Sequence, residues 1–165
     1  MNQTLSIIAK EVGLLEPDRL PLRMAFGLAC VSRVEHLLED PRAQDCLRLL
    51  RQFVSGKANL DTLSAVKAEV AQIASSHRGS QSIDGSAHAA VSATYALANA
   101  LANRPLEAAD YAAYASVYAY GGYAVGDPTA FEPEFAWQVE QLQQLASDPN
   151  YGIELGMAQS DRSRS

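Results

Sequence analysis

Apolar residues recur through most of the chain at intervals of three and four positions, which places them on one face of an α-helix. The first such segment covers about residues 3–15 and ends before Pro17. A second starts at Pro21 and runs to about Leu38, because the Asp40-Pro41 pair that follows disfavours helical geometry. A third covers residues 42–55, and Gly56 is placed to end it.

The second half of the chain continues the helical pattern. Asn59 or Asp61 is suited to cap a fourth helix, and the polar, glycine-punctuated stretch 77–85 predicts the clearest internal loop. Four helices are expected here, over residues 59–75, 86–103, 107–124 and 133–146, and the third of these should dissolve at Gly121-Gly122 or shortly after. No alternating strand pattern of useful length appears. The sequence therefore predicts an all-α fold, a compact bundle of about seven helices with no sheet.

The length of 165 residues is typical of one domain. We expect a single helical domain over residues 1–147 and a poorly ordered C-terminal tail over 148–165. The N-terminus lacks the basic start, apolar run and cleavage site of a signal peptide. No apolar run approaches the ~20 residues that span a bilayer. These features predict a cytoplasmic protein without a membrane partner.

Charge and reactive side chains narrow the possible functions. A formal charge of −6 argues against nucleic acid as a partner and is compatible with a basic protein partner. Cys30 and Cys46 lie on separate predicted helices, so we expect buried free thiols, with a disulfide or a metal pair as the alternative. The chain carries no phosphate-binding loop and no nucleophile elbow. We therefore expect no cofactor and no enzymatic activity.

Histidine chemistry leaves one enzymatic alternative. None of the three histidines has another His or Cys one helical turn away, which argues against a zinc site. His88, Tyr95 and nearby carboxylates could still line a small catalytic or ligand-binding site. A histidine held by hydrogen bonds at a helix interface is the favoured interpretation.

Tyrosines are concentrated in the two alanine-rich helices, at Tyr95, Tyr111, Tyr114, Tyr118, Tyr120 and Tyr123. Tyr111, Tyr114 and Tyr118 share one helical face. Tyrosine buries its ring and keeps a hydroxyl for a partner, which suits helix interfaces and protein-binding surfaces alike. We expect most of these rings to fill gaps between the helices. Tyr120 and Tyr123 lie off this face and are the better candidates for exposure.

A series of short motifs between about residues 20 and 146 resembles one known family. The motifs are Arg23 and Phe26 before Cys30-Val-Ser-Arg33-Val34, the Asp40-Pro41-Arg42 turn, Phe53-Val-Ser-Gly56, His88-Ala-Ala, Tyr111-Ala-Ala-Tyr114 and Trp137-Gln138. This order is similar to that of the all-α immunity proteins of bacterial polymorphic toxin systems, in the alanine-rich family numbered fifth. The resemblance implies a cytoplasmic protein that binds a cognate toxin and neutralises it by occlusion, without catalysis.

The resemblance supplies no contact residues, so the candidate surface is a hypothesis from residue type. It combines acidic residues suited to a basic toxin with aromatics expected to be exposed, namely Glu35, Glu39, Asp40, Tyr120, Phe131, Glu132 and Glu134. The alternative function is a structural or oligomer-forming helical protein, for which the tyrosine and alanine surfaces are suited.

Overall fold

A computed structural model describes residues 1–77 and 85–151 of the chain, and all regular structure in these ranges is helical. The α-helices of these ranges are α1 (Gln3–Glu11), α2 (Leu20–Ser32), α3 (Pro41–Val54), α4 (Leu60–Ser75), α5 (Gly85–Leu101), α6 (Pro105–Tyr120) and α7 (Glu132–Ser147). Short 3₁₀ turns connect or follow them, namely η1 (Pro17–Arg19), η2 (Glu35–Leu37), η4 (Gly122–Gly126), η5 (Pro128–Phe131) and η6 (Pro149–Tyr151). The predicted all-α bundle is confirmed.

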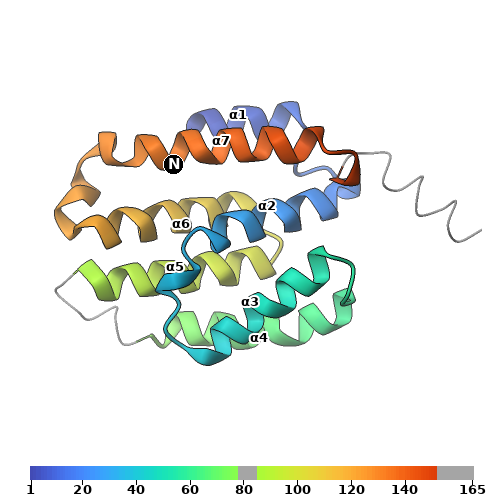
Figure 1. Ribbon diagram of the computed structural model, residues 1–165, viewed down its shortest axis with the longest axis horizontal. Coiled ribbons are helices and arrows are strands. Elements are labelled where there is room, and N and C mark those ends of the chain that lie inside the picture. The colour runs from blue at the N-terminus through green and yellow to red at the C-terminus, as the bar shows by residue number, and fades with distance from the viewer. Residues whose placement is uncertain (78–84, 152–165) are drawn as a thin grey trace, which may run out of the picture.

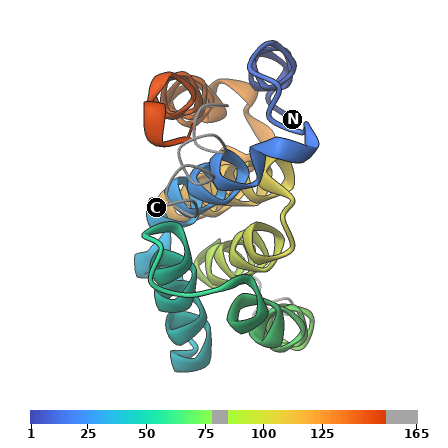
Figure 2. The same ribbon diagram turned by 90° about the vertical axis from the view of Figure 1, so that its right-hand side faces the viewer.

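The helices are arranged in tiers around a central group (Figures 1 and 2). Helices α2, α5 and α6 form the middle and pack against one another. Helices α1 and α7 lie side by side on one side of this group, and α3 and α4 lie on the other (Figure 2). Helices α5 and α6, which are adjacent in sequence and antiparallel, make the most extensive contact in the molecule.

Small side chains make this central contact possible. The α5–α6 interface is built largely from buried alanines, including Ala93, Ala96, Ala108 and Ala112. Gly27 of α2 faces Ala100 of α5, and a Cβ atom at position 27 would lie 3.1 Å from the Ala100 Cβ. The approach of the α2 and α5 backbones therefore depends on the absence of a side chain at Gly27.

Larger side chains fill the space around this contact. One continuous cluster of buried apolar residues extends from Leu5 of α1 to Leu142 of α7 and includes Phe26 and Leu97. A second, smaller cluster joins the end of α6 to the turns that follow it, through Ala113, Val117, Ala124 and Phe131.

Three helices are followed, two positions after their last residue, by a residue with positive φ. These residues mark the helix ends more precisely than the apolar periodicity does. Gly13 (φ +66°), Gly56 (φ +80°) and Asn103 (φ +61°) follow α1, α3 and α5. At each end the amide of this residue and the amide of the residue after it donate to carbonyls of the last turn, as Leu14 does to Ala9 at 2.9 Å. The prediction that the first helix reaches residue 15 was wrong, because Gly13 turns the chain first.

Helix α2 ends earlier than predicted, at Ser32 rather than near Leu38, and the turn η2 follows. Val34 and Leu38, on either side of this turn, are both buried in the core. Helix α6 ends at Tyr120, directly before the Gly121-Gly122 pair at which it was expected to dissolve. The turn η4 that follows takes Ala124 into the second cluster.

A buried arginine joins the ends of two helices to α2. Arg23 donates from Nε to Asn103 Oδ1 (2.8 Å), and from Nη1 to the carbonyl oxygens of Leu14 and Glu16. Burial lowers the pKa of Arg23, and the nearby Asp18 carboxylate opposes this shift. A guanidinium remains charged under these conditions, so its hydrogen bonds are charge-assisted.

A second buried polar network joins α1, α6 and α7. Asn2 donates from Nδ2 to Gln138 Oε1 and to the Phe135 carbonyl, both at 3.1 Å. Gln138 in turn donates to the Ala109 carbonyl at 2.8 Å, and Asn2 Oδ1 accepts from the Leu5 amide. The network therefore holds the start of α1 against α6 and α7.

The end of the predicted domain is described only in part. Tyr151, in η6, packs against the main core, so ordered structure continues past residue 147. The predicted poorly ordered tail lies, from residue 152 on, outside the described residues, as does most of the predicted loop 77–85.

We predict that Gly27→Leu lowers the free energy of unfolding by about 1–3 kcal/mol, because a side chain here forces α2 and α5 apart. Denaturant unfolding followed by circular dichroism measures the change. Ala68→Leu, on the exposed face of α4, is the matched control and should leave the stability nearly unchanged. Equal stability of the two variants would contradict the close approach of α2 and α5.

Arg23→Met is expected to cost about 2–3 kcal/mol, because three buried or partly buried acceptors lose a charged donor while the apolar length of the side chain is kept. The loss of stability is followed as the decrease in the midpoint temperature of thermal unfolding. Arg48→Met removes an exposed arginine whose partner is Asp45 on the same helix, and should cost well under about 1 kcal/mol. If the two variants unfold at the same temperature, Arg23 does not stabilise the helix ends.

Candidate protein-binding surface

An exposed pair of tyrosines lies where α6 ends. Tyr120 and Tyr123 are each 80% exposed, and their ring centroids are 6.3 Å apart with the planes at 57°. The prediction that these two rings are exposed is confirmed. The interaction between the two hydroxyls raises the pKa of Tyr123.

Gly121 allows this arrangement. A Cβ atom at position 121 would lie 2.6 Å from Cε1 of Tyr123, so the ring of Tyr123 lies directly over the glycine. The chain then enters η4 and carries the ring back toward Tyr120. A side chain at position 121 would displace the Tyr123 ring from this position.

The tyrosine pair borders a surface hollow of about 550 Å³, which we call the tyrosine hollow. Its lining comes from the end of α6, the turns η4 and η5 and the start of α7, and consists of Ser116, Val117, Tyr120, Tyr123, Ala124, Asp127, Ala130, Pro133 and Glu134. Val117 and Ala124 are buried and belong to the second cluster, so the base of the hollow is apolar. Its described lining includes two carboxylates and no basic side chain.

A neighbouring hollow brings part of the predicted acidic surface to the same end of the molecule. It has a volume of about 370 Å³, and its lining includes His36 and Glu39 together with Gly121 and Gly122. Glu39 therefore lies beside the segment that carries the tyrosine pair. Glu35, on the turn η2 that also supplies His36, belongs to the same region.

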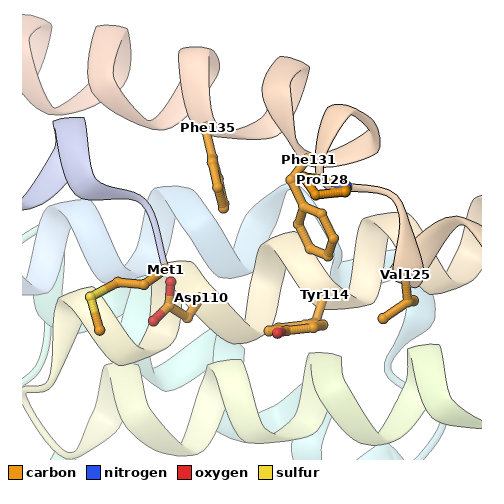
Figure 3. A pocket seen from close by; sticks show the side chains of 7 residues that line it. All are labelled: Met1, Asp110, Tyr114, Val125, Pro128, Phe131 and Phe135. Atoms are coloured by element: carbon orange, nitrogen blue, oxygen red, sulfur yellow. The ribbon is translucent and has the colours of Figure 1, made fainter.

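Phe131 lies on the other side of the η4–η5 segment, in a pocket of about 300 Å³ that also includes Asp110 and Phe135 (Figure 3). The prediction that Phe131 is exposed was wrong, because its side chain is only 8% exposed. The turn η5 directs its ring toward α6, where it meets Tyr114 edge-on with centroids 5.2 Å apart (Figure 3). Phe131 is a core residue of the second cluster.

Most of the candidate carboxylates are paired within the chain. Glu134 accepts from Arg33 through both oxygens, at 2.6 and 3.1 Å, and the guanidinium lies 4.5 Å from the centre of the Trp137 ring. Glu35 forms an ion pair with Arg51 at 2.8 Å. These pairs reduce the negative charge that the surface offers to a partner.

Three candidate carboxylates remain, those of Asp40, Glu39 and Glu132. Asp40 caps α3 and pairs with Arg42, whose hydrogen bonds lower the pKa of the Asp40 carboxyl. Glu39 lies 3.6 Å from His77. Glu132 lines a separate groove, between the start of α1 and α7. The seven candidates therefore do not form one surface, and Glu35, Glu39, Tyr120 and Glu134 are the ones that the fold brings to the same end.

Asp127 is the acidic residue that the sequence interpretation missed. Its side chain caps η5 by accepting from the amide and the hydroxyl of Thr129, at 3.0 and 2.8 Å. It is exposed, lines the tyrosine hollow, and forms no ion pair with any described residue. The Asp127-Pro128 pair is a helix-start signal of the same kind as Asp40-Pro41, and this signal could have identified it.

The stripe of tyrosines on α6 was expected to fill gaps between helices, and this was wrong for two of its members. Tyr111 and Tyr114 are 38% and 40% exposed. Buried alanines already fill the α5–α6 interface, so these two rings lie at its border and pack on rings of α5 and α6. Tyr111 stacks on Tyr95 with centroids 5.2 Å apart, and Tyr118 lies between Tyr114 and His88.

The placement of the described residues gives no support for a metal site or for redox chemistry at the cysteines. Over the described ranges, no three His, Cys, Asp or Glu side chains are grouped to hold a metal ion. Cys30 and Cys46 are free and buried, as predicted. Burial raises the pKa of both thiols, that of Cys46 to about 11. Among helices in the described part of the chain, none is long and apolar enough to cross a membrane.

Fold and surface together define an all-α protein with exposed aromatic rings beside a carboxylate-lined hollow. The chain belongs to the Imm-5-like family of immunity proteins, because the model of the family described as "Imm-5 like putative immunity protein" matches residues 24–145. This match confirms the resemblance to an immunity protein family. No curated protein and no solved structure matches the chain.

Both thiols are expected to be inert in the folded protein at pH 8. The raised pKa of Cys46 leaves about one molecule in a thousand as thiolate at that pH, and burial excludes the reagent from both sulfurs. A colorimetric thiol reagent should detect no thiol in buffer and two in concentrated guanidinium chloride without reductant. A thiol that reacts equally fast in both conditions would contradict the buried, free state.

Proposed function

We propose that this chain is a cytoplasmic immunity protein that binds a cognate bacterial toxin and neutralises it by covering its active site. Membership of the immunity protein family over residues 24–145 is the observation that carries the proposal. The matched range includes every residue of the tyrosine hollow. Occlusion requires shape and charge complementarity rather than catalysis by this chain.

The end of the molecule that carries Tyr120 and Tyr123 is the proposed contact surface. Tyrosine supplies a large amphipathic contact area with few rotatable bonds, which is why it is enriched at protein interfaces. The apolar base of the tyrosine hollow can be desolvated by a partner, while Asp127 contributes a polar rim and Glu39 lines the neighbouring hollow. With a net charge of −6, the chain favours a basic partner such as a nuclease toxin.

Coexpression tests this function. The toxin domain encoded beside this chain's gene should stop growth when expressed alone, and coexpression of this chain should restore growth. The purified pair should form a stable complex of defined stoichiometry, measured by size-exclusion chromatography with light scattering. An unrelated toxin domain is the control and should be neither bound nor neutralised. Neither rescue nor complex with the neighbouring domain would contradict the proposal.

Self-association is the competing function, and the exposed Tyr111–Tyr114 stripe is the observation that favours it. Sedimentation of the chain alone distinguishes the two. A binding protein with a free contact surface should sediment as a monomer at micromolar concentration. An oligomer that persists on dilution and that Tyr111→Ala dissociates would support the structural alternative instead.

A further inference from the structure

The tyrosine hollow offers an unusual combination of groups on one surface. Two exposed aromatic rings, an apolar base and a carboxylate without an ion-pair partner among the described residues lie together at the end of α6. Aromatic faces attract cations through their electron-rich centres, and a nearby carboxylate adds direct charge attraction. The two rings and the carboxylate therefore favour a cation as the occupant of the hollow.

The chain already holds one cation in this manner at the border of the hollow. The Arg33 guanidinium is held between the face of Trp137, 4.5 Å away, and both oxygens of Glu134. Glu134 is thereby neutralised, so the charge that the hollow presents comes from Asp127. Tyr120, Tyr123 and Asp127 form a second aromatic and carboxylate set at this surface, and the described side chains of the lining supply no cation for it.

We infer that the tyrosine hollow receives an arginine side chain of the toxin partner, held against Tyr120 and Tyr123 and paired with Asp127. This inference rests on the proposed function and specifies the recognition chemistry. Arginine fits better than lysine, because its planar guanidinium stacks on aromatic rings and donates in a fork to a carboxylate. The volume of about 550 Å³ exceeds what one such side chain requires, so the hollow also accepts part of the neighbouring partner surface.

Asp127 is well placed to keep its orientation when a partner binds. Its hydrogen bonds to the Thr129 amide and hydroxyl hold the carboxylate at the start of η5. Both of these bonds reach Oδ1, so Oδ2 has no hydrogen-bond donor among the described residues. A guanidinium can therefore approach Oδ2 without breaking the cap.

The experiment uses the complex of the full chain with the toxin domain encoded beside its gene, with the dissociation constant measured by calorimetry at several salt concentrations. Asp127→Asn keeps the side-chain oxygen that caps η5 and removes the charge, and should weaken binding about tenfold with a shallower salt dependence. The double variant Tyr120→Ala with Tyr123→Ala should weaken binding at least about thirtyfold.

Two matched controls are available in the same chain. Asp148 caps the Pro149–Tyr151 turn by accepting from the Asn150 amide, so Asp148→Asn changes an Asp-Pro cap of the same kind away from the hollow. Tyr111→Ala removes an exposed tyrosine of the same helix. Both controls should bind as the unchanged chain does. Thermal melts of all variants identify any that are unfolded, and Asp127→Asn is retained as the decisive variant if the double tyrosine variant is unstable.

A double-mutant cycle identifies the partner residue. Each arginine and lysine of the toxin domain is replaced by alanine and tested against both the unchanged chain and Asp127→Asn. One arginine should lose less affinity in the Asp127→Asn background, by about fivefold or more. Coupling to a lysine alone, or to no basic residue, overturns the inference while the complex itself still supports the proposed function. If the unchanged chain binds no neighbouring domain, the proposed function fails and the inference fails with it.

Discussion

The close approach of α2, α5 and α6 is the constraint on which the rest of the structure depends. Gly27 opposite Ala100, and the alanines between α5 and α6, bring these helices nearer than larger side chains would allow. Larger buried apolar side chains fill the space around this contact, and α1 and α7 cover the central group on one side and α3 and α4 on the other (Figure 2). Tyr111 and Tyr114 of α6 lie outside the alanine contact and remain partly exposed.

Alanine-rich helix surfaces are nearly flat. Packing of small residues alone would therefore fix the relative positions of the helices only weakly. The buried polar groups supply the missing specificity. Arg23 fixes α2 against the chain reversal after α1 and the end of α5, and the Asn2–Gln138 network fixes α1 against α6 and α7. Each donor has a defined acceptor, so an alternative helix register would leave buried polar atoms unpaired.

Local signals in the sequence predicted the helices well. Apolar spacing located the α-helices of the described ranges, and Asn59 and Gly56 act at helix ends as predicted. The errors concern features that depend on distant contacts. Periodicity could not show that alanines fill the α5–α6 interface and that Tyr111 therefore remains exposed. The pairing of Glu134 with Arg33 joins positions 101 residues apart, and composition alone counts such a carboxylate as available charge.

The Arg33–Glu134 contact joins segments that lie far apart in the sequence and are therefore synthesised at different times. Segments from the end of α2, the end of α6 and the start of α7 form the surface around the tyrosine hollow, and none of them can form it alone. A ribosome must therefore release residues past Trp137 before this surface exists, and the bundle must then close. Under the proposed function, such late maturation would leave an interval after translation starts during which new copies offer no protection. Copies already folded would then have to cover that interval.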